Sequence, residues 1–153
     1  MAINPNTTFT AGAVYTADQS NRFPRGIMAY AQSTTSDSTI TAEETQLTAS
    51  SFVAISNRYY RITYYEPDIQ TPATSGTFVQ SRIKIGATVY TVGQVQNASA
   101  TVLNYVLNTS VVVTGLSGAT VFTGTLQCSA GTALAVRAAT APAYILVEDI
   151  GPA

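Results

Sequence analysis

The feature that most constrains this chain is a run of 52 consecutive residues, 85–136, without one charged side chain. Much of the run alternates apolar residues with Thr, Ser, Asn or Gln, the period-2 pattern of strands that bury one face. The solvent face of a monomeric sheet normally carries Lys and Glu, which also protect its edges from pairing with other chains. Two interpretations therefore stay open. The run forms a neutral surface solvated by hydroxyls and amides, or much of it is buried between identical subunits, since interface centres are depleted of charge.

Strand patterns continue through almost all of the chain after Gly26. Residues 58–66 place Tyr60, Ile62 and Tyr64 on one face, and residues 77–85 alternate in the same way. Further strands are expected at 27–33, 38–42, 50–56, 88–96, 101–107, 110–114, 119–127, 132–138 and 143–148. Many short strands separated by turn clusters are typical of an antiparallel β-sandwich or barrel, so the sequence predicts an all-β domain over residues 26–153.

The first 25 residues differ from this domain. Residues 1–15 are polar, contain Pro5 and Gly12, and show no core periodicity. They form either a disordered tail or an extended N-terminal arm docked on a neighbouring molecule, and we favour the arm. The segment Thr-Ala-Asp-Gln at 16–19 has a capping-box pattern, and Pro24 limits the helix that follows, so we expect one short helical turn.

Composition excludes several classes of function. Charged residues make up 10% of the chain, against roughly 25% in an average globular protein, while 24 Thr and 13 Ser take their place. The chain has no His, so it has no His-activated nucleophile and no His-containing zinc site. Its single cysteine, Cys128, is interpreted as a small buried hydrophobe. We expect no enzyme, no cofactor and no metal.

Charge and hydropathy also bear on partners. A net charge of −1 provides no counterion-release drive toward nucleic acid and no polybasic patch for a membrane. The N-terminus lacks the basic and apolar regions of a signal peptide, and no stretch reaches the roughly 20 apolar residues of a spanning helix. We expect a chain made in a cytoplasm, with neither nucleic acid nor membrane as a partner.

The charged side chains show little sign of a site. Two pairs of carboxylates are adjacent in the sequence, Glu43/Glu44 and Glu148/Asp149, and on a strand the members of each pair would point to opposite faces unless the backbone turns there. The sequence Glu66-Pro67-Asp68 is interpreted as a loop, either an ordinary solvated turn or a weak calcium site. We interpret four basic residues as part of an exposed face that pairs with nearby carboxylates: Arg58, Arg61, Arg82 and Lys84. Among the clustered tyrosines, Tyr60 and Tyr64 are expected in the core, and Tyr59 and Tyr65 at an interface or surface.

Three segments, in chain order, resemble tail and fibre proteins of bacteriophages, notably phages of actinobacteria. Residues 10–26 resemble a linker in which Thr-Ala-x-x-x-Asn leads to a Pro-Arg-Gly entry into a β domain. Residues 53–63 are similar to their Asn-Arg-x-Tyr-Arg/Lys-Ile strand, and residues 143–153 to their Leu-Val-Glu-Asp-Ile/Leu-Gly terminus. The middle of the chain, residues 86–130, is similar to these proteins only in its general character.

The resemblance implies a jelly-roll-like sandwich that forms a homotrimer, as C1q- and TNF-like heads do, in a non-enzymatic structural protein on the virion exterior. Residues 1–25 would attach it to other virion proteins, and residues 26–153 would form the oligomeric head. The chain lacks a coiled-coil shaft and a collagen-like repeat, so a capsid decoration role stays open beside a tail role. The alternative is a receptor-binding head or carbohydrate-binding module for a host-surface glycan, with Tyr65, Tyr90 and Tyr105 as candidate ligand-stacking or interface residues.

Overall fold

The computed structural model describes residues 11–12, 14 and 17–153, and it is almost entirely β-structure. The elements are α1 (Ala17–Asn21), β1 (Gly26–Ser33), β2 (Asp37–Ile40), β3 (Glu44–Thr48), β4 (Phe52–Ala54), β5 (Arg58–Gln70), β6 (Phe78–Ile85), β7 (Thr88–Gln96), β8 (Asn104–Val113), β9 (Gly118–Thr120), β10 (Thr123–Cys128), β11 (Ala133–Ala135) and β12 (Ala143–Pro152). Within the described ranges, none of the helical structure is long and apolar enough to cross a membrane.

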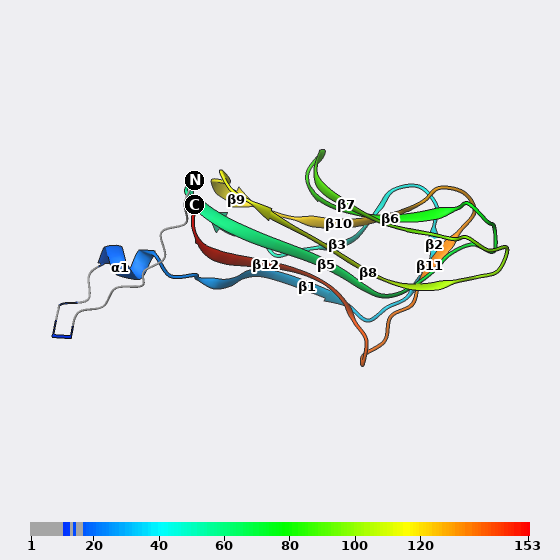
Figure 1. Ribbon diagram of the computed structural model, residues 1–153, viewed down its shortest axis with the longest axis horizontal. Helices are drawn as coiled ribbons and strands as arrows, with labels where there is room; N and C mark the ends of the chain where they lie inside the picture. Colours follow the sequence, from blue (N-terminus) through cyan, green and yellow to red (C-terminus); the bar gives the residue numbers. More distant parts are fainter. Residues whose placement is uncertain (1–10, 13, 15–16) are drawn as a thin grey trace.

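The strands pair as one long hairpin folded over on itself. The innermost antiparallel pair is β6–β7, followed outward by β5–β8, β3–β10 and β1–β12. Folding places β1, β12, β5 and β8 in sheet A, which β11 and β2 extend, and β3, β10, β6 and β7 in sheet B. The two sheets lie as two layers along the long axis of the molecule, and β4 and β9 form a small third sheet (Figure 1). Nested pairs divided between two antiparallel sheets define a jelly roll, which confirms the predicted all-β sandwich.

The core lies between sheets A and B and follows the predicted parity of the strands. On β5, Tyr60, Ile62 and Tyr64 are almost wholly buried, and β6 contributes Val79 and Ile83 to the same core. Apolar side chains at every second position bury one face of each strand, which holds its register because a slip of one residue would expose them all.

The two sheets are in close contact where β10 crosses β5. A Cβ atom added to Gly124 would lie 2.8 Å from Cδ2 of Tyr64, so the ring of Tyr64 packs directly on the glycine backbone. Gly93 of β7 is in a similar position, since its added Cβ would lie 2.1 Å from the Oγ1 of Thr109 on β8. Glycine at these two strand positions therefore sets the distance between the layers.

The structure differs from the sequence-based strands in three places. The expected strands 101–107 and 110–114 form one strand, β8, in which the buried Thr109 continues the inward parity. The expected strand 119–127 is divided between β9 and β10, and β3 was not predicted. In each case, polar residues at inward positions or within a strand obscured the alternation that sequence reasoning relies on.

The short predicted helix is confirmed as α1, which lies at the same end of the sandwich as the last residues of β12 (Figure 1). Its predicted capping residue, Thr16, lies outside the described residues. So does most of the segment that we expect to act as an arm, at 1–10, 13 and 15.

We expect Gly124→Ala to destabilise the domain by about 1–3 kcal/mol, because the new methyl group must displace the Tyr64 ring in a packed core. The free energy of unfolding measured in urea checks this. Thr123→Ala, one residue earlier on the same strand, is the matched control and should change stability by less than about 0.5 kcal/mol. Equal stability of Gly124→Ala and the unmodified protein would show that the sheets are less tightly packed than described.

Candidate functional site

The first candidate site is the junction between α1 and the sandwich, where Arg58 holds the incoming chain. Arg58 begins β5 and is 4% exposed. Its Nη1 donates to the carbonyl oxygen of Asn21 at 2.7 Å, and its Nη2 donates to that of Phe23 at 2.6 Å. The residues that enter the β domain are thus bound to the sheet by a buried cation.

Asp149 of β12 holds the guanidinium in place from the neighbouring strand. Its Oδ1 accepts from Arg58 Nη2 at 2.6 Å, and its Oδ2 contacts Arg58 Nε. The backbone N–H of Gly151 donates to the same carboxylate at 3.0 Å. Because a buried ion pair is costly to break by removing one partner, this group fixes where the N-terminal segment leaves the sandwich.

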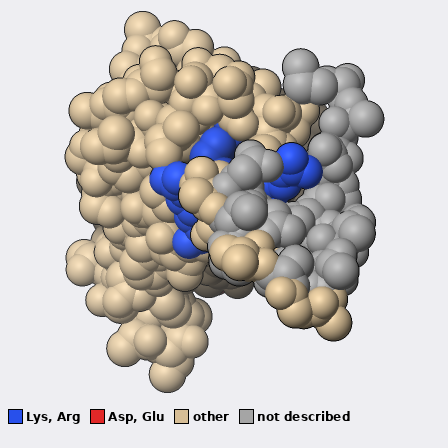
Figure 2. All heavy atoms as spheres, turned by 90° about the vertical axis from the view of Figure 1, so that its left-hand side faces the viewer, with Lys and Arg blue, Asp and Glu red and all other residues tan. Residues whose placement is uncertain are grey.

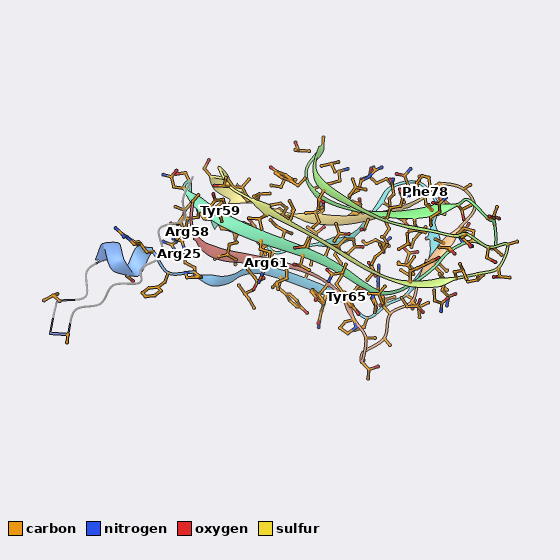
Figure 3. The ribbon with its side chains drawn as sticks, viewed as in Figure 1. Arg25, Arg58, Tyr59, Arg61, Tyr65 and Phe78 are labelled. Carbon is orange, nitrogen blue, oxygen red and sulfur yellow. The ribbon has the colours of Figure 1, made fainter. Side chains whose placement is uncertain are left out.

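Positive side chains predominate at this end of the molecule. Figure 2 looks onto this end and shows basic side chains gathered there, with no Asp or Glu in view. In Figure 3, Arg25 and Arg58 lie together here, and Tyr59, Arg61 and Tyr65 follow along β5. We call Asn21–Arg25 together with Arg58 and Asp149 the arm junction.

The second candidate site is the outer face of sheet A, where three tyrosines on adjacent strands stack. Tyr144 of β12 stacks on Tyr65 of β5, with ring centroids 5.1 Å apart and 25° between the ring planes. On its other side it stacks on Tyr30 of β1, at 6.3 Å and 27°. Ile27 and Leu146 complete this group, which we call the aromatic face: Ile27, Tyr30, Tyr65, Tyr144 and Leu146.

The aromatic face is open to solvent. Four of its members, all except Tyr65, line an open hollow of about 530 Å³. Ile27 is 67% exposed and Tyr30 43% exposed. The neighbouring strand β8 adds Val106 and Val112, which are also more than half exposed. Exposed apolar side chains that gather on one face of a sheet indicate a candidate interaction site.

The outer face of sheet B has a cluster of charged side chains. There Glu43 accepts from Lys84 Nζ at 2.7 Å, from Arg82 Nη1 at 2.5 Å and from the Thr125 hydroxyl at 2.9 Å. The hydrogen bond from Lys84, against the opposing effect of burial, holds the pKa of Glu43 below its ordinary value. The outer face of sheet B therefore has a charged cluster beside the exposed Val89 and Val92 of β7, whereas the outer face of sheet A has the aromatic face beside one ion pair, Arg61 with Glu148.

The interpretation of Glu66-Pro67-Asp68 as a loop was wrong, because β5 continues through these residues to Gln70. Glu66 is fully buried and accepts from Arg137 Nε at 2.9 Å and Nη2 at 2.7 Å, and from the Tyr64 hydroxyl at 2.5 Å. Burial, followed by the Glu66 charge, raises the pKa of Tyr64 well above its ordinary value. The inward parity of Tyr60, Ile62 and Tyr64 extends to Glu66, and this signal was available in the sequence.

The calcium alternative for this segment finds no ligand set. The carboxylate of Glu66 is engaged by Arg137 and Tyr64. Asp68 has one buried oxygen without a partner, and Asn104 Nδ2 approaches its other oxygen at 3.5 Å. Among the described residues, no group of three or more His, Cys, Asp or Glu side chains is placed to hold a metal ion.

The structure does not bring the three candidate tyrosines together. Tyr65 belongs to the aromatic face, whereas Tyr90 packs edge-on against Phe122, with ring centroids 5.7 Å apart. Tyr105 lies at the start of β8, where its hydroxyl donates to the carbonyl oxygen of Gln96 at 2.8 Å. Sequence reasoning missed Tyr30 and Tyr144, although both lie within predicted strands, because their position beside Tyr65 depends on the order of strands in the sheet.

The structure also shows the surroundings of the four basic residues, of Cys128 and of the Glu148/Asp149 pair. Arg58 is buried rather than on an exposed face, which its parity with Tyr60 could have indicated. The other three basic residues pair as predicted, Arg61 with Glu148, and Arg82 and Lys84 with Glu43. Cys128 is confirmed as a buried free cysteine. Glu148 and Asp149 are confirmed on opposite faces, since one pairs outward with Arg61 and the other inward with Arg58.

Comparison with known proteins adds little to this geometry. No family model matches the chain, and no curated protein matches it. A chain in the structure of the infectious bursal disease virus Gx strain is 13% identical, with a TM-score of 0.37, over 97% of this chain and 43% of that chain. A chain in the structure of the Gt strain is 14% identical, with a TM-score of 0.27, over 98% of this chain and 47% of that chain.

This chain thus spans less than half the length of either viral chain. TM-scores below 0.5 do not define a common fold, so the jelly roll is assigned from the strand order itself.

We expect Arg58→Met to open the arm junction to trypsin, which cleaves after Arg22 and Arg25. Loss of hydrogen bonds to a charged donor removes about 1.5–3 kcal/mol from local closure, so cleavage there should be faster by roughly tenfold or more. The readout is the rate at which the N-terminal fragment is released, by mass spectrometry.

Arg61→Met, at an exposed ion pair on the same strand, is the control and should leave this rate unchanged. If Arg58→Met alone fails to fold, combining it with Asp149→Asn removes the unpaired buried charge and keeps the test. Unchanged cleavage in a folded variant would show that Arg58 does not hold the junction.

Proposed function

We propose that this chain is a non-enzymatic structural protein of a bacteriophage virion, attached to other virion proteins through residues 1–25 and exposing its β-sandwich on the virion exterior. The observation that carries the proposal is the arm junction. A buried Arg58–Asp149 pair binds the backbone of Asn21 and Phe23, so that a pull on the N-terminal segment is transmitted to two central strands of the sheet. Such a connection suits a segment used for attachment.

Two further observations support a structural role. The jelly roll is a fold used by viral capsid domains, although also by lectin-type domains and cupins, so the fold alone does not decide the function. The three segments that resemble phage tail and fibre proteins include both strands of the junction, with Arg58 in one and Asp149 in another. Both a tail position and a capsid decoration position accommodate these features, and synthesis would take place in the bacterial cytoplasm.

The absence of an enzymatic function is part of the proposal. The sequence has no His, and the carboxylates of Glu43, Glu66, Glu148 and Asp149 are each engaged by a basic side chain. A carboxylate held in an ion pair is a poor general acid or base at neutral pH, since its charged form is stabilised.

A receptor-binding or carbohydrate-binding head is the second candidate function, and the exposed tyrosines of the aromatic face favour it. Sugar rings stack on aromatic faces, and Tyr side chains combine apolar area with a polar tip. Tyr30 and Tyr65 are the ends of the stack and each leaves one ring face free of the other two tyrosines. A glycan array probed with the labelled protein tests this function, since a purely structural part binds no glycan.

Deleting residues 1–14 should leave a folded β domain that no longer enters virions, because the arm supplies the attachment and the described core lies in 26–153. Incorporation is measured by immunoblotting of purified particles of the virus that encodes the chain, with circular dichroism as the folding check. Normal incorporation of the truncated chain would refute attachment through the arm, and loss of folding would place the arm in the core.

The full chain should elute as a homotrimer of about 48 kDa, three times its mass of 16.0 kDa, because a charge-free run and an exposed apolar face both suit burial between copies. Light scattering coupled to size exclusion gives the mass directly. A monomer at micromolar concentration would favour the neutral-surface interpretation of residues 85–136.

A further inference from the structure

We infer that the aromatic face of sheet A is the surface on which a second copy of this chain packs. The inference rests on the proposed structural function and assigns its self-association to one surface. It is carried by the contrast between the two outer faces of the sandwich, together with the size and the charge of the aromatic face.

The two outer faces differ in how their exposed side chains are partnered. On the outer face of sheet B, the side chains of Glu43, Arg82, Lys84 and Gln80 hydrogen-bond to one another or to neighbours and remain accessible to water. Val89 and Val92 of β7 are 43% and 49% exposed there, but in the strand register they pair with Lys84 and Arg82. On the outer face of sheet A, Ile27 and Tyr30 are 67% and 43% exposed, and Tyr30 stacks on Tyr144. Stacked tyrosines beside exposed apolar side chains suit the core of a protein interface, where Tyr is enriched.

The charge-free run reaches this same surface. Strand β8 lies wholly within residues 85–136, and its outward residues Val106 and Val112 border the aromatic face across β5. Pairing of Val112 with Arg61, and of Ser110 with Thr63, continues the face from β1 to β8 without a second ion pair among the described residues. One part of the unusual sequence run therefore contributes to the unusual surface.

The dimensions suit a protein interface. Four strands at a spacing of about 4.8 Å give a width of roughly 19 Å, and the ten residues of β12 give a length of roughly 33 Å. The outer face of sheet A, of which the aromatic face is one part, therefore covers about 600 Å² in projection. A standard interface buries about 800 Å² of accessible surface on each partner, which a side-chain-covered area of this size can supply.

The charge of the face favours a copy of this chain over a charged partner. Across β1, β12, β5 and β8, the outer face of sheet A carries one ion pair, Arg61 with Glu148 at 2.9 Å, and this pair adds no net charge. Copies related by a three-fold axis can turn this surface toward one another without net repulsion, and Arg61 of one copy can meet a carboxylate of the next. The outer face of sheet B places Arg82 and Lys84 around one Glu43, so two such faces would repel.

The geometry of the tyrosines favours a protein over a glycan here. A centroid distance of 5.1 Å requires the rings of Tyr65 and Tyr144 to overlap face to face rather than lie flat and side by side. Tyr144 therefore has Tyr65 on one side and Tyr30 on the other. A sugar would find one free ring face at each end of the stack, on Tyr30 and on Tyr65, instead of a broad flat platform, whereas aliphatic and aromatic side chains of a second copy can pack against ring edges as well as ring faces.

The test places a charge on the aromatic face and compares it with the same change on sheet B. Tyr30→Arg and Leu146→Arg should each reduce the light-scattering mass to that of the 16.0 kDa monomer at a concentration where the unmodified chain is assembled. Thermal melts and circular dichroism should show a folded domain, because Tyr30 is already 43% exposed. Gln94→Arg, on the outer face of sheet B, is the matched control and should keep the assembled mass.

A second measurement is thiol labelling of an introduced, exposed cysteine, which is selective because the native Cys128 is buried. Thr63→Cys, at the centre of the outer face of sheet A, should react at least tenfold more slowly with a thiol reagent in the assembled protein than after Tyr30→Arg is added. Gln80→Cys, on sheet B, should react equally fast in both backgrounds. This readout does not depend on the mass of the assembly.

Three results would overturn the inference: a monomeric unmodified chain at 100 μM, an unchanged mass for folded Tyr30→Arg and Leu146→Arg, or equal labelling of Thr63→Cys in both backgrounds. If the chain is a monomer that binds a glycan, and Tyr30→Arg abolishes that binding, the face belongs to the carbohydrate-binding alternative.

Incorporation into virions is measured separately, so that the two proposals can fail independently. If the chain assembles through this face but is absent from particles, the proposed function is refuted and the inference stands. If the chain is a monomer that enters particles, the inference is refuted and the proposed function stands.

Discussion

The structure depends on the alternation of side chains along β5, which pairs with β12 on one edge and β8 on the other. Every inward position of this strand from Arg58 to Glu66 is buried, including the two charged ones at its ends. Burying Arg58 and Glu66 is tolerable because Asp149 and Arg137 neutralise them with paired hydrogen bonds. The two ion pairs connect this central strand to the arm junction at one end and to the β11–β12 connection at the other.

The outward side chains of the same strand have different surroundings. Tyr59, Arg61, Thr63 and Tyr65 alternate with the buried set and, together with β1, β12 and β8, make the outer face of sheet A. Sheet B shields the inward side of the strand, but nothing in the described part of the chain covers its outward side. An apolar surface left open in this way has a free-energy gain still available on association, of roughly 25 cal/mol per Å² buried.

Strand positions were predicted best where the alternation was strict. Residues 59–65 were placed on the correct faces, as were 77–85, where inward and outward residues mostly alternate in polarity, and 88–96 was predicted with its observed bounds. The prediction was wrong where a polar residue lies inward. Glu66 was assigned to a loop and Arg58 to an exposed face, since their partners Arg137 and Asp149 are 71 and 91 residues away in the sequence.

Local sequence determined that this chain is all β-structure, that it has one helical turn before the domain, and which residues of each strand share a face, because these depend on neighbours within a few positions. Strand order was decided by the tertiary structure alone. Tyr30, Tyr65 and Tyr144 are far apart in the chain and form one stack only because β12 lies between β1 and β5. Pairing between distant strands is settled by the packing of the whole core, so neither the aromatic face nor the arm junction could be assembled from the sequence.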